Sequence, residues 1–229
     1  MTDFGPDLDH ILSAFPSADI KNTLPMQLAN LTQLYIAEKE KYAHVTYFFN
    51  GGYAEPVNGE DRTAIPSPDV KSYDMVPGMS SVELTESIIN NIISPNKDKK
   101  CKYDFTVLNF AAPDMVAHTG NLKAGIECCE IVDQSAGKIV DAYLKVDGTV
   151  LITADHGNVE EMINLETDEI DTEHSVNPVP FVIVNKKLKS KLKLREHGVL
   201  ADIAPTILDL LGIEKGEEMK GKSLIISKL

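Results

Sequence analysis

The spacing of hydrophobic residues predicts strands that alternate with helices along most of the chain. Short apolar runs at 105–110, 149–153 and 180–184 have the length and residue types of buried strands. Apolar residues at helical spacing predict helices over 81–93 and after the strand at 105–110, and Gly212 ends a predicted helix over 201–211. This order predicts an α/β fold with a mostly parallel sheet and helices on both faces.

The segment after the strand at 105–110 has the clearest helical stripe. Its members are Ile126, Cys129, Val132, Ala136, Ile139, Val140 and Tyr143. The first half of the chain is less regular, with a weakly defined lead-in at 1–30, a short strand at 31–37 and a helix at 42–49. Residues 50–79 hold four prolines and many charges and are interpreted as a long surface loop, and the lysine-rich stretch 95–102 as a solvated one.

Composition narrows the class of protein. Against 35 acidic residues there are 22 Lys and Arg, a net charge of −13, which argues against sequence-independent nucleic-acid binding. No apolar run is long enough for a membrane span, and the first residues lack the basic and apolar regions of a secretory signal. The three cysteines, Cys101, Cys128 and Cys129, form no disulfide or zinc-ribbon spacing, so we expect reduced thiols in the cytoplasm.

Candidate chemistry follows the predicted strands. Asp114 and His118 come after the strand at 105–110, and their i, i+4 spacing places a carboxylate and an imidazole on one side of a helical turn. Asp155 and His156 come directly after the strand at 149–153, where a turn at Gly157 brings both onto one ion. Ligand crevices of such sheets lie beyond the carboxyl ends of the strands, so both pairs are expected at one edge.

His174, in a loop before the last predicted strand, completes a set of two Asp and three His. An ordinary ion pair or helix cap is the more common explanation for any single Asp-His pair. Five such residues at strand ends instead favour a metal site with oxygen and nitrogen ligands, suited to Mn, Co, Zn or Mg. Two clusters suggest two metal ions and phosphoryl or sulfuryl transfer. His10, His44 and His197 lack such a carboxylate partner and are interpreted as structural or surface residues.

Several segments together resemble one family. Residues 40–46 (EKYAHVT), 109–120 (NFAAPDMVAHTG), 152–158 (ITADHGN) and 174–180 (HSVNPVP) are similar to the cofactor-independent, or 2,3-bisphosphoglycerate-independent, phosphoglycerate mutases. This family belongs to the alkaline phosphatase superfamily. The similarity runs from about Ala14 to the last residue and includes 50–52, 65–68, 201–206 and 218–223.

The resemblance implies roles for individual residues. Asp114, His118 and His174 match the ligands of one manganese ion, and Asp155 and His156 match ligands of a second. Lys41 matches a lysine that contacts the phosphate of the substrate or of a phosphoenzyme. The implied reaction interconverts 3-phosphoglycerate and 2-phosphoglycerate through a phosphoserine, without 2,3-bisphosphoglycerate. Family members place this reaction in glycolysis and gluconeogenesis.

The chain departs from the family in length. Members are about twice as long, and the nucleophilic serine, one further aspartate ligand and a transferase domain have no counterpart in these 229 residues. Ser80, Ser81 and Ser135 are explained by a helix cap or helix, so none is assigned as the nucleophile. We therefore expect residues 1–229 to be the C-terminal portion of a split metal-binding phosphatase domain, with an incomplete sheet and an unpaired strand edge.

Two alternatives stay open at this point. One is a metal-dependent phosphatase or sulfatase of the same superfamily. The other is a non-catalytic metal-binding chain that either complements a separate N-terminal partner or has no activity.

Overall fold

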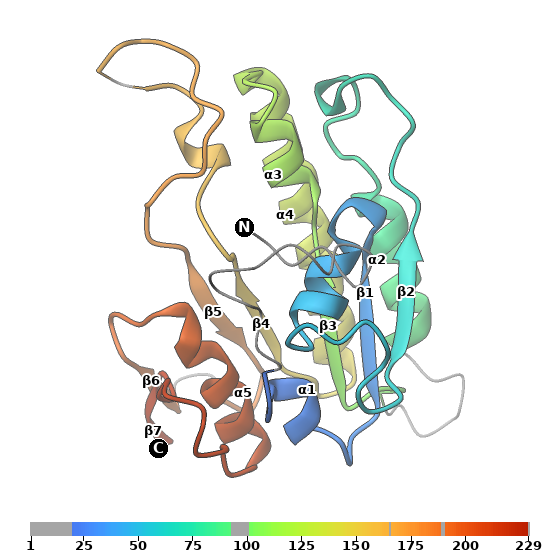
Figure 1. Cartoon of the computed structure of the whole chain (residues 1–229), viewed down its shortest axis with the longest axis vertical. Coiled ribbons are helices and arrows are strands. Elements are labelled where there is room, and N and C mark those ends of the chain that lie inside the picture. The colour runs from blue at the N-terminus through green and yellow to red at the C-terminus, as the bar shows by residue number, and fades with distance from the viewer. Residues whose placement is uncertain (1–19, 93–100, 165, 189–190, 229) are drawn as a thin grey trace, which may run out of the picture.

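A three-stranded parallel sheet organises the first half of the molecule. The computed structural model describes residues 20–92, 101–164, 166–188 and 191–228. Strand β1 (Gln33–Glu38) lies between β2 (Asp61–Ile65) and β3 (Phe105–Asn109), and both neighbours run parallel to it (Figure 1). Ala37 stands opposite Ala64 on one side and Asn109 on the other. The carboxyl ends of all three strands therefore meet at one edge, as the sequence predicts.

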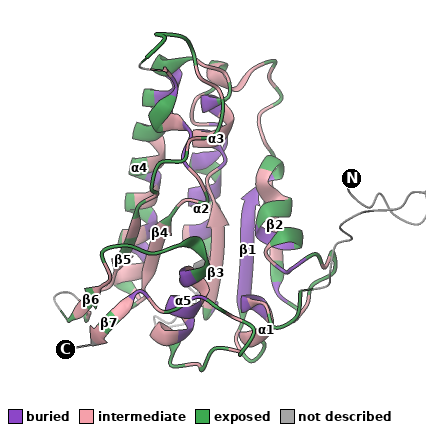
Figure 2. Cartoon of the chain, turned by 60° about the vertical axis from the view of Figure 1, so that its left-hand side comes forward, coloured by how far each residue is buried: buried purple, intermediate pink, exposed green. Residues whose placement is uncertain are grey.

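Both faces of the central strand β1 are covered by other residues. Every one of its six residues is buried (Figure 2). Leu34 and Ile36 pack against Leu84 and Ile88 of helix α2 (Ser81–Ile92) and Ile139 of α4 (Leu122–Lys145). On the opposite face, Tyr35 and Ala37 pack against Val45, Phe49 and neighbouring residues. This alternation confirms the predicted α/β class, with helical segments on both faces of the sheet.

Helix α4 confirms the later part of the predicted stripe, where Ile139 is buried and Val132 and Tyr143 pack against the core, but not its start. Its buried residues are Ala124, Gly125, Cys128, Ser135, Ile139 and Ala142. Ile126 is 56 % exposed and Cys129 is exposed, so the stripe that begins with these two residues is wrong near the start of the helix. Small residues lie inward there because the chain approaches closely: a Cβ at Gly125 would stand 2.6 Å from the Met162 sulfur. Hydrophobicity alone does not reveal that contact.

The second half of the chain pairs its strands differently. Strand β4 (Val150–Thr153) pairs antiparallel with β5 (Phe181–Val184), with Val150 opposite Val184. The described residues between these two strands form no crossover helix, which a parallel pair needs. Strands β6 (Leu192–Leu194) and β7 (Ile225–Lys228) form another antiparallel pair. The expected parallel arrangement thus holds for β1, β2 and β3 only.

Most of the other predicted elements are confirmed within a few residues. Helix α5 (Ile203–Leu211) ends at Gly212, whose φ of 71° lies in the left-handed region that glycine adopts easily. The predicted helix at 42–49 is a helical segment at His44–Phe48. Strand β2 lies within the expected loop 50–79 and was not predicted. Its first three residues are polar, and none of its five residues is buried, so the strand has little hydrophobic signal. Residues 1–19 of the lead-in, residue 93 of the predicted helix and residues 95–100 of the lysine-rich stretch lie outside the described residues.

Residues 20–30, the described part of the lead-in, contain one short helix. Leu24 of helix α1 (Leu24–Gln27) and the following Leu28 pack against Leu208 of α5. This contact brings the first described helix against the last one (Figure 1). No helix within the described ranges is both long and apolar enough to cross a lipid bilayer.

Glu38 ends β1 as a fully buried carboxyl group. Burial raises its pKa to about 7, and the Ser80 backbone and the Ser67 hydroxyl lower it only in part. Neither carboxylate oxygen makes a hydrogen bond of good geometry within the described structure. Folding therefore favours the protonated form of Glu38 at pH values below about 7.

This burial predicts a pH dependence of stability. The pKa of Glu38 is raised on folding from 4.5 to about 7, so the folded state binds the extra proton between these values and the free energy of unfolding falls as pH rises through that window. In the wild-type protein we expect the free energy of unfolding to fall by about 2–3 kcal/mol between pH 4.5 and 7.5 because of this residue, and Glu38→Gln should abolish that decrease. Urea unfolding at a series of pH values measures it.

Glu130→Gln is the matched control, because Glu130 is exposed on α4. It should keep the wild-type pH profile. An unchanged profile in Glu38→Gln would contradict the account of this buried carboxyl group.

Candidate metal centre

Asp114 and His118 stand together at the carboxyl edge of the parallel sheet. Helix α3 (Ala112–Ala117) starts shortly after β3, carries Asp114 in its first turn and has His118 at its C-terminus. The one-turn spacing brings His118 Nε2 to 3.2 Å from Asp114 Oδ1. The structure thus brings this sequence-predicted pair together.

His174 joins this pair from a loop 56 residues beyond His118. Its Nε2 atom lies 3.2 Å from Asp114 Oδ1 and 3.2 Å from His118 Nε2. The three ligand atoms lie within 4.8 Å of one another, and this is the one group of three candidate ligands among the described residues. Ligand atoms held about 2.0–2.2 Å from a single ion stand roughly 3–3.6 Å apart, so the spacing fits a metal.

The orientation of His118 also favours a metal. Its Nδ1 atom lies 2.7 Å from the Thr172 carbonyl oxygen, which can only accept a hydrogen bond. Nδ1 therefore carries the hydrogen in the neutral ring, and the lone pair of Nε2 points into the group of ligands. A backbone carbonyl that fixes the ring in this way is the usual support of a metal-binding histidine.

Asp114 carries the negative charge of the group. Burial by itself would raise its pKa, but hydrogen bonds from Lys41 and Asn158 and the charge of Lys41 outweigh burial and lower the pKa to about 2. Asn158 Nδ2 donates to Oδ1 at 2.8 Å, and Lys41 Nζ forms an ion pair with Oδ2. Asp114 is therefore ionised across the physiological range, as a metal ligand must be.

Lys41 belongs to the same site although the chain places it far from Asp114. It ends the short helical turn Lys39–Lys41, directly after β1. Its side chain is only 14 % exposed, and its ammonium group contacts Asp114. Its position at a strand end and its ion pair with the mostly shielded Asp114 carboxylate distinguish Lys41 from the exposed lysines of the chain.

Asp155 and His156 lie beside the group of three. Their side chains are 3.7 Å apart, and the ring of His156 stacks on that of His174 with centroids 3.8 Å apart. Asp155 is 64 % exposed. These two residues offer two possible metal ligands next to the first group. Among the described residues, no third side chain completes a second group of ligands.

Three residues that shape the site were not predicted from the sequence. Asn158 bonds to Asp114, Thr172 orients His118, and Glu160 accepts hydrogen bonds from residues of both neighbouring loops. Asn158 had a signal, because it is a polar residue directly after a strand-end motif, and it is only 5 % exposed. Thr172 and Glu160 act through contacts between separate loops, which one sequence does not reveal.

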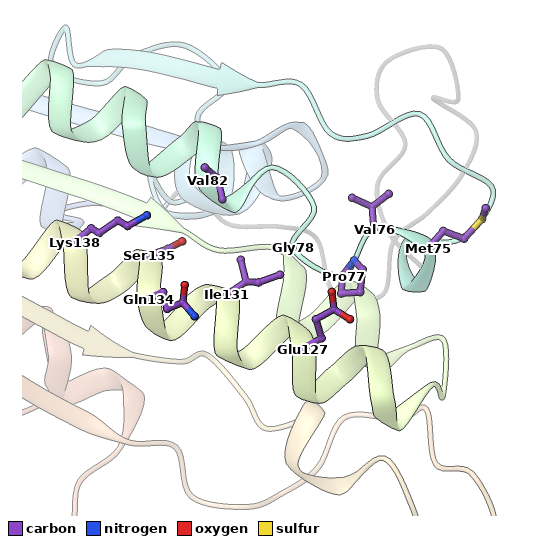
Figure 3. A pocket seen from close by; sticks show the side chains of 10 residues that line it. All are labelled: Met75, Val76, Pro77, Gly78, Val82, Glu127, Ile131, Gln134, Ser135 and Lys138. Carbon is purple, nitrogen blue, oxygen red and sulfur yellow. The ribbon is translucent and has the colours of Figure 1, made fainter.

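A surface cavity elsewhere on the molecule contains none of these residues. It has a volume of about 400 Å³ and lies between residues 75–82 and one face of α4 (Figure 3). Ile131 and Pro77 contribute apolar surface there, and Glu127 and Lys138 contribute charges. The candidate metal ligands therefore lie outside this cavity.

Comparison with known proteins identifies the family. A family model described as "Metalloenzyme superfamily" matches residues 6–215. The chain belongs to the metalloenzyme superfamily. This assignment agrees with a site made of carboxylate and imidazole donors, and it supports the use of divalent metal.

Individual relatives are more specific. The chain is 52 % identical over 226 residues to the 2,3-bisphosphoglycerate-independent phosphoglycerate mutase of Clostridium acetobutylicum and 48 % identical over 227 residues to that of Clostridioides difficile. Each match covers 98 % of this chain and 43 % of the relative. The chain thus spans less than half the length of these curated relatives.

A solved structure shares the fold. The phosphoglycerate mutase of Leishmania mexicana, determined at low cobalt concentration, is 32 % identical with a TM-score of 0.77. The match covers 87 % of this chain and 38 % of that one. It confirms that the resemblance in sequence extends to the fold.

We expect Asp114→Asn to weaken Mn²⁺ binding by more than about 100-fold, because the substitution keeps the shape of the side chain and removes its charge. Isothermal titration calorimetry with Mn²⁺ measures the change. Asp133→Asn removes the same charge from an exposed position on α4 and should bind Mn²⁺ like the wild-type chain. Equal affinities for the two variants would rule out Asp114 as a ligand.

Proposed function

We propose that this chain supplies the metal-binding part of a 2,3-bisphosphoglycerate-independent phosphoglycerate mutase. The reaction interconverts 3-phosphoglycerate and 2-phosphoglycerate. The observation that carries the proposal is that the ligand atoms of Asp114, His118 and His174 lie close together. The sequence of the chain is also about 50 % identical to those of enzymes with that name. Glycolysis and gluconeogenesis are the setting in which such a reaction is used.

Two divalent metal ions are part of the proposal, with Mn²⁺ preferred and Co²⁺, Mg²⁺ or Zn²⁺ also suited to the donors. Asp114, His118 and His174 would hold one ion, and Asp155 and His156 would contribute to the second. Such ions supply charge that activates a hydroxyl nucleophile and neutralises a transferring phosphoryl group. In this proposal 2,3-bisphosphoglycerate is not a cofactor.

Lys41 is the proposed contact for the phosphoryl group. Its ammonium lies at the metal centre and is mostly shielded from water, so its charge is stronger there than on the surface. A positive charge fixed beside a transferring phosphoryl group stabilises the oxygens on which charge develops. Lys41 would thus orient the substrate and offset its charge.

The nucleophilic serine is proposed to come from residues beyond this chain. Ser135 is buried in α4, Ser81 is fully buried, and the Ser80 hydroxyl donates to the Pro66 carbonyl, so none of the three faces the site. Strand edges support a missing part as well. Within the described structure β3 pairs only with β1 and β4 only with β5, which leaves one edge of each strand for a partner segment.

The same proposal places the protein in the cytoplasm. Cys101, Cys128 and Cys129 are all free thiols, as is usual in a reducing compartment. The proposed ligand is the small-molecule phosphoglycerate, with neither nucleic acid nor membrane as a partner.

A chimera tests the function. This chain replaces the matching 43 % of the Clostridioides difficile relative, and a coupled assay follows conversion of 3-phosphoglycerate with Mn²⁺. We expect activity that a chelator abolishes and that 2,3-bisphosphoglycerate leaves unchanged. Lys41→Ala in the chimera should lose about 100-fold or more in kcat/KM, whereas exposed Lys39→Ala should not.

The unfused chain provides the opposing outcome. We expect it to bind Mn²⁺ without turning over phosphoglycerate or a chromogenic phosphate ester. Chelator-sensitive hydrolysis of the ester by the chain alone would instead indicate a phosphatase of the same superfamily. An inactive chimera that folds and binds Mn²⁺ would contradict the mutase proposal.

A further inference from the structure

One carboxylate links the two loops that carry most of the candidate ligands. Glu160 belongs to the short helical turn Val159–Glu161, which follows the loop of Asp155 and His156. Its Oε2 atom accepts a hydrogen bond from the Asn158 backbone N–H at 2.8 Å. Its Oε1 atom accepts from the Ser175 hydroxyl and from Asn177 Nδ2, the latter at 3.1 Å. Glu160 therefore receives three donors from two loops.

The backbone reinforces this link. Gly157 and Ser175 form an isolated antiparallel bridge, in which the Ser175 N–H donates to the Gly157 carbonyl at 2.8 Å. A Cβ atom at Gly157 would collide with both the Glu160 carboxylate and the Ser175 hydroxyl. Glycine at this position thus allows the carboxylate to reach the second loop.

The link lies one residue from the proposed metal ligand His174. His174 directly precedes Ser175, stacks on His156, and holds its Nε2 atom 3.2 Å from Asp114 Oδ1. Asn158, whose backbone Glu160 binds, sends its side chain to the same Asp114 oxygen. Glu160 is therefore connected to both sides of the metal centre, and within the described residues it forms no hydrogen bond or ion pair with a candidate ligand.

Proton transfer does not explain this arrangement. Burial would raise the pKa of Glu160, but the hydrogen bonds from Ser175, Asn177 and the backbone prevail and lower it to about 2. A carboxylate with so low a pKa is a poor base for the Ser175 hydroxyl. Its contacts suit it to hold geometry.

We propose that Glu160 is a positioning residue that fixes His174 against Asp114 by binding the loop of Asn158 and the loop of Ser175 at once. This inference rests on the metal centre of the proposed function. Outer partners that orient a ligand typically change metal affinity by about 10- to 100-fold when they are removed. The role of Glu160 is thus to set the affinity of the site for its metal.

Glu160→Gln and Glu161→Gln form a matched pair of variants. Each removes one negative charge, but in the described structure the Glu161 side chain accepts a hydrogen bond from Asn177 alone, at 2.8 Å. A glutamine at 160 replaces one of the two acceptor oxygens with an NH2 donor and removes the charge, so one of the two loops loses its charge-assisted hydrogen bond. We expect Glu160→Gln to bind Mn²⁺ about 10- to 100-fold more weakly and Glu161→Gln to bind within about threefold of wild type.

Electron paramagnetic resonance of free Mn²⁺ measures affinity on the full chain, and visible absorption of bound Co²⁺ reports ligand geometry. We expect the Co²⁺ spectrum to change in Glu160→Gln and not in Glu161→Gln. Ser175→Ala should lose affinity comparably, and the double variant should lose little more, because both substitutions break one link.

Thermal unfolding of the metal-free variants separates positioning from folding. We expect metal-free Glu160→Gln to unfold near the wild-type temperature. A large drop there that accounts for the weaker binding would overturn the proposal, as would wild-type affinity in Glu160→Gln or equal losses in both glutamine variants. A wild-type chain that binds no Mn²⁺ would instead overturn the proposed function on which this inference rests.

Discussion

The site depends on one negative charge that is mostly shielded from water, that of Asp114. A carboxylate removed from water is costly unless it meets cations or hydrogen-bond donors. Here Lys41, Asn158, His118 and His174 all direct a nitrogen atom toward Asp114. These partners lie in segments after β1, β3 and β4 and before β5. The Asp114 side chain therefore contacts residues that are far apart in the sequence.

The sheet makes this gathering possible. Because β1 and β3 are parallel, the segments that leave their carboxyl ends begin at the same edge, and Lys41 meets Asp114 there. The antiparallel pair β4 and β5 contributes differently. Its connection leaves at the end of β4 and returns to the start of β5, so both ends of the loop segment lie at one edge. His156 and His174 stack because they lie near these two ends.

Much of the fold and of the site could be predicted from sequence, for identifiable reasons. Strands and helices with buried apolar stripes were found, and the one-turn spacing of Asp114 and His118 placed both correctly. Strand β2 was missed because a half-exposed edge strand has little hydrophobic signal. The wrong residues at the start of the α4 stripe reflect close packing against Met162, which depends on the fold.

What sequence could not supply was the set of contacts between loops. Glu160 and Thr172 contact partners at least 15 residues away, and nothing in their local sequence marks those partners. Lys41 was assigned through resemblance to a family, and its ion pair with Asp114 depends on strand order. The ion pairs and hydrogen bonds between loops at this edge of the sheet could therefore be identified only in the structure.

The central claim is that Asp114, His118 and His174 hold one divalent ion. A crystal structure of the chain grown with Mn²⁺, with anomalous differences measured at the manganese edge, tests it most directly. The account predicts a strong peak within about 2.0–2.3 Å of Asp114 Oδ1, His118 Nε2 and His174 Nε2. A peak bound only elsewhere, or no peak beside these three atoms at saturating Mn²⁺, would contradict it.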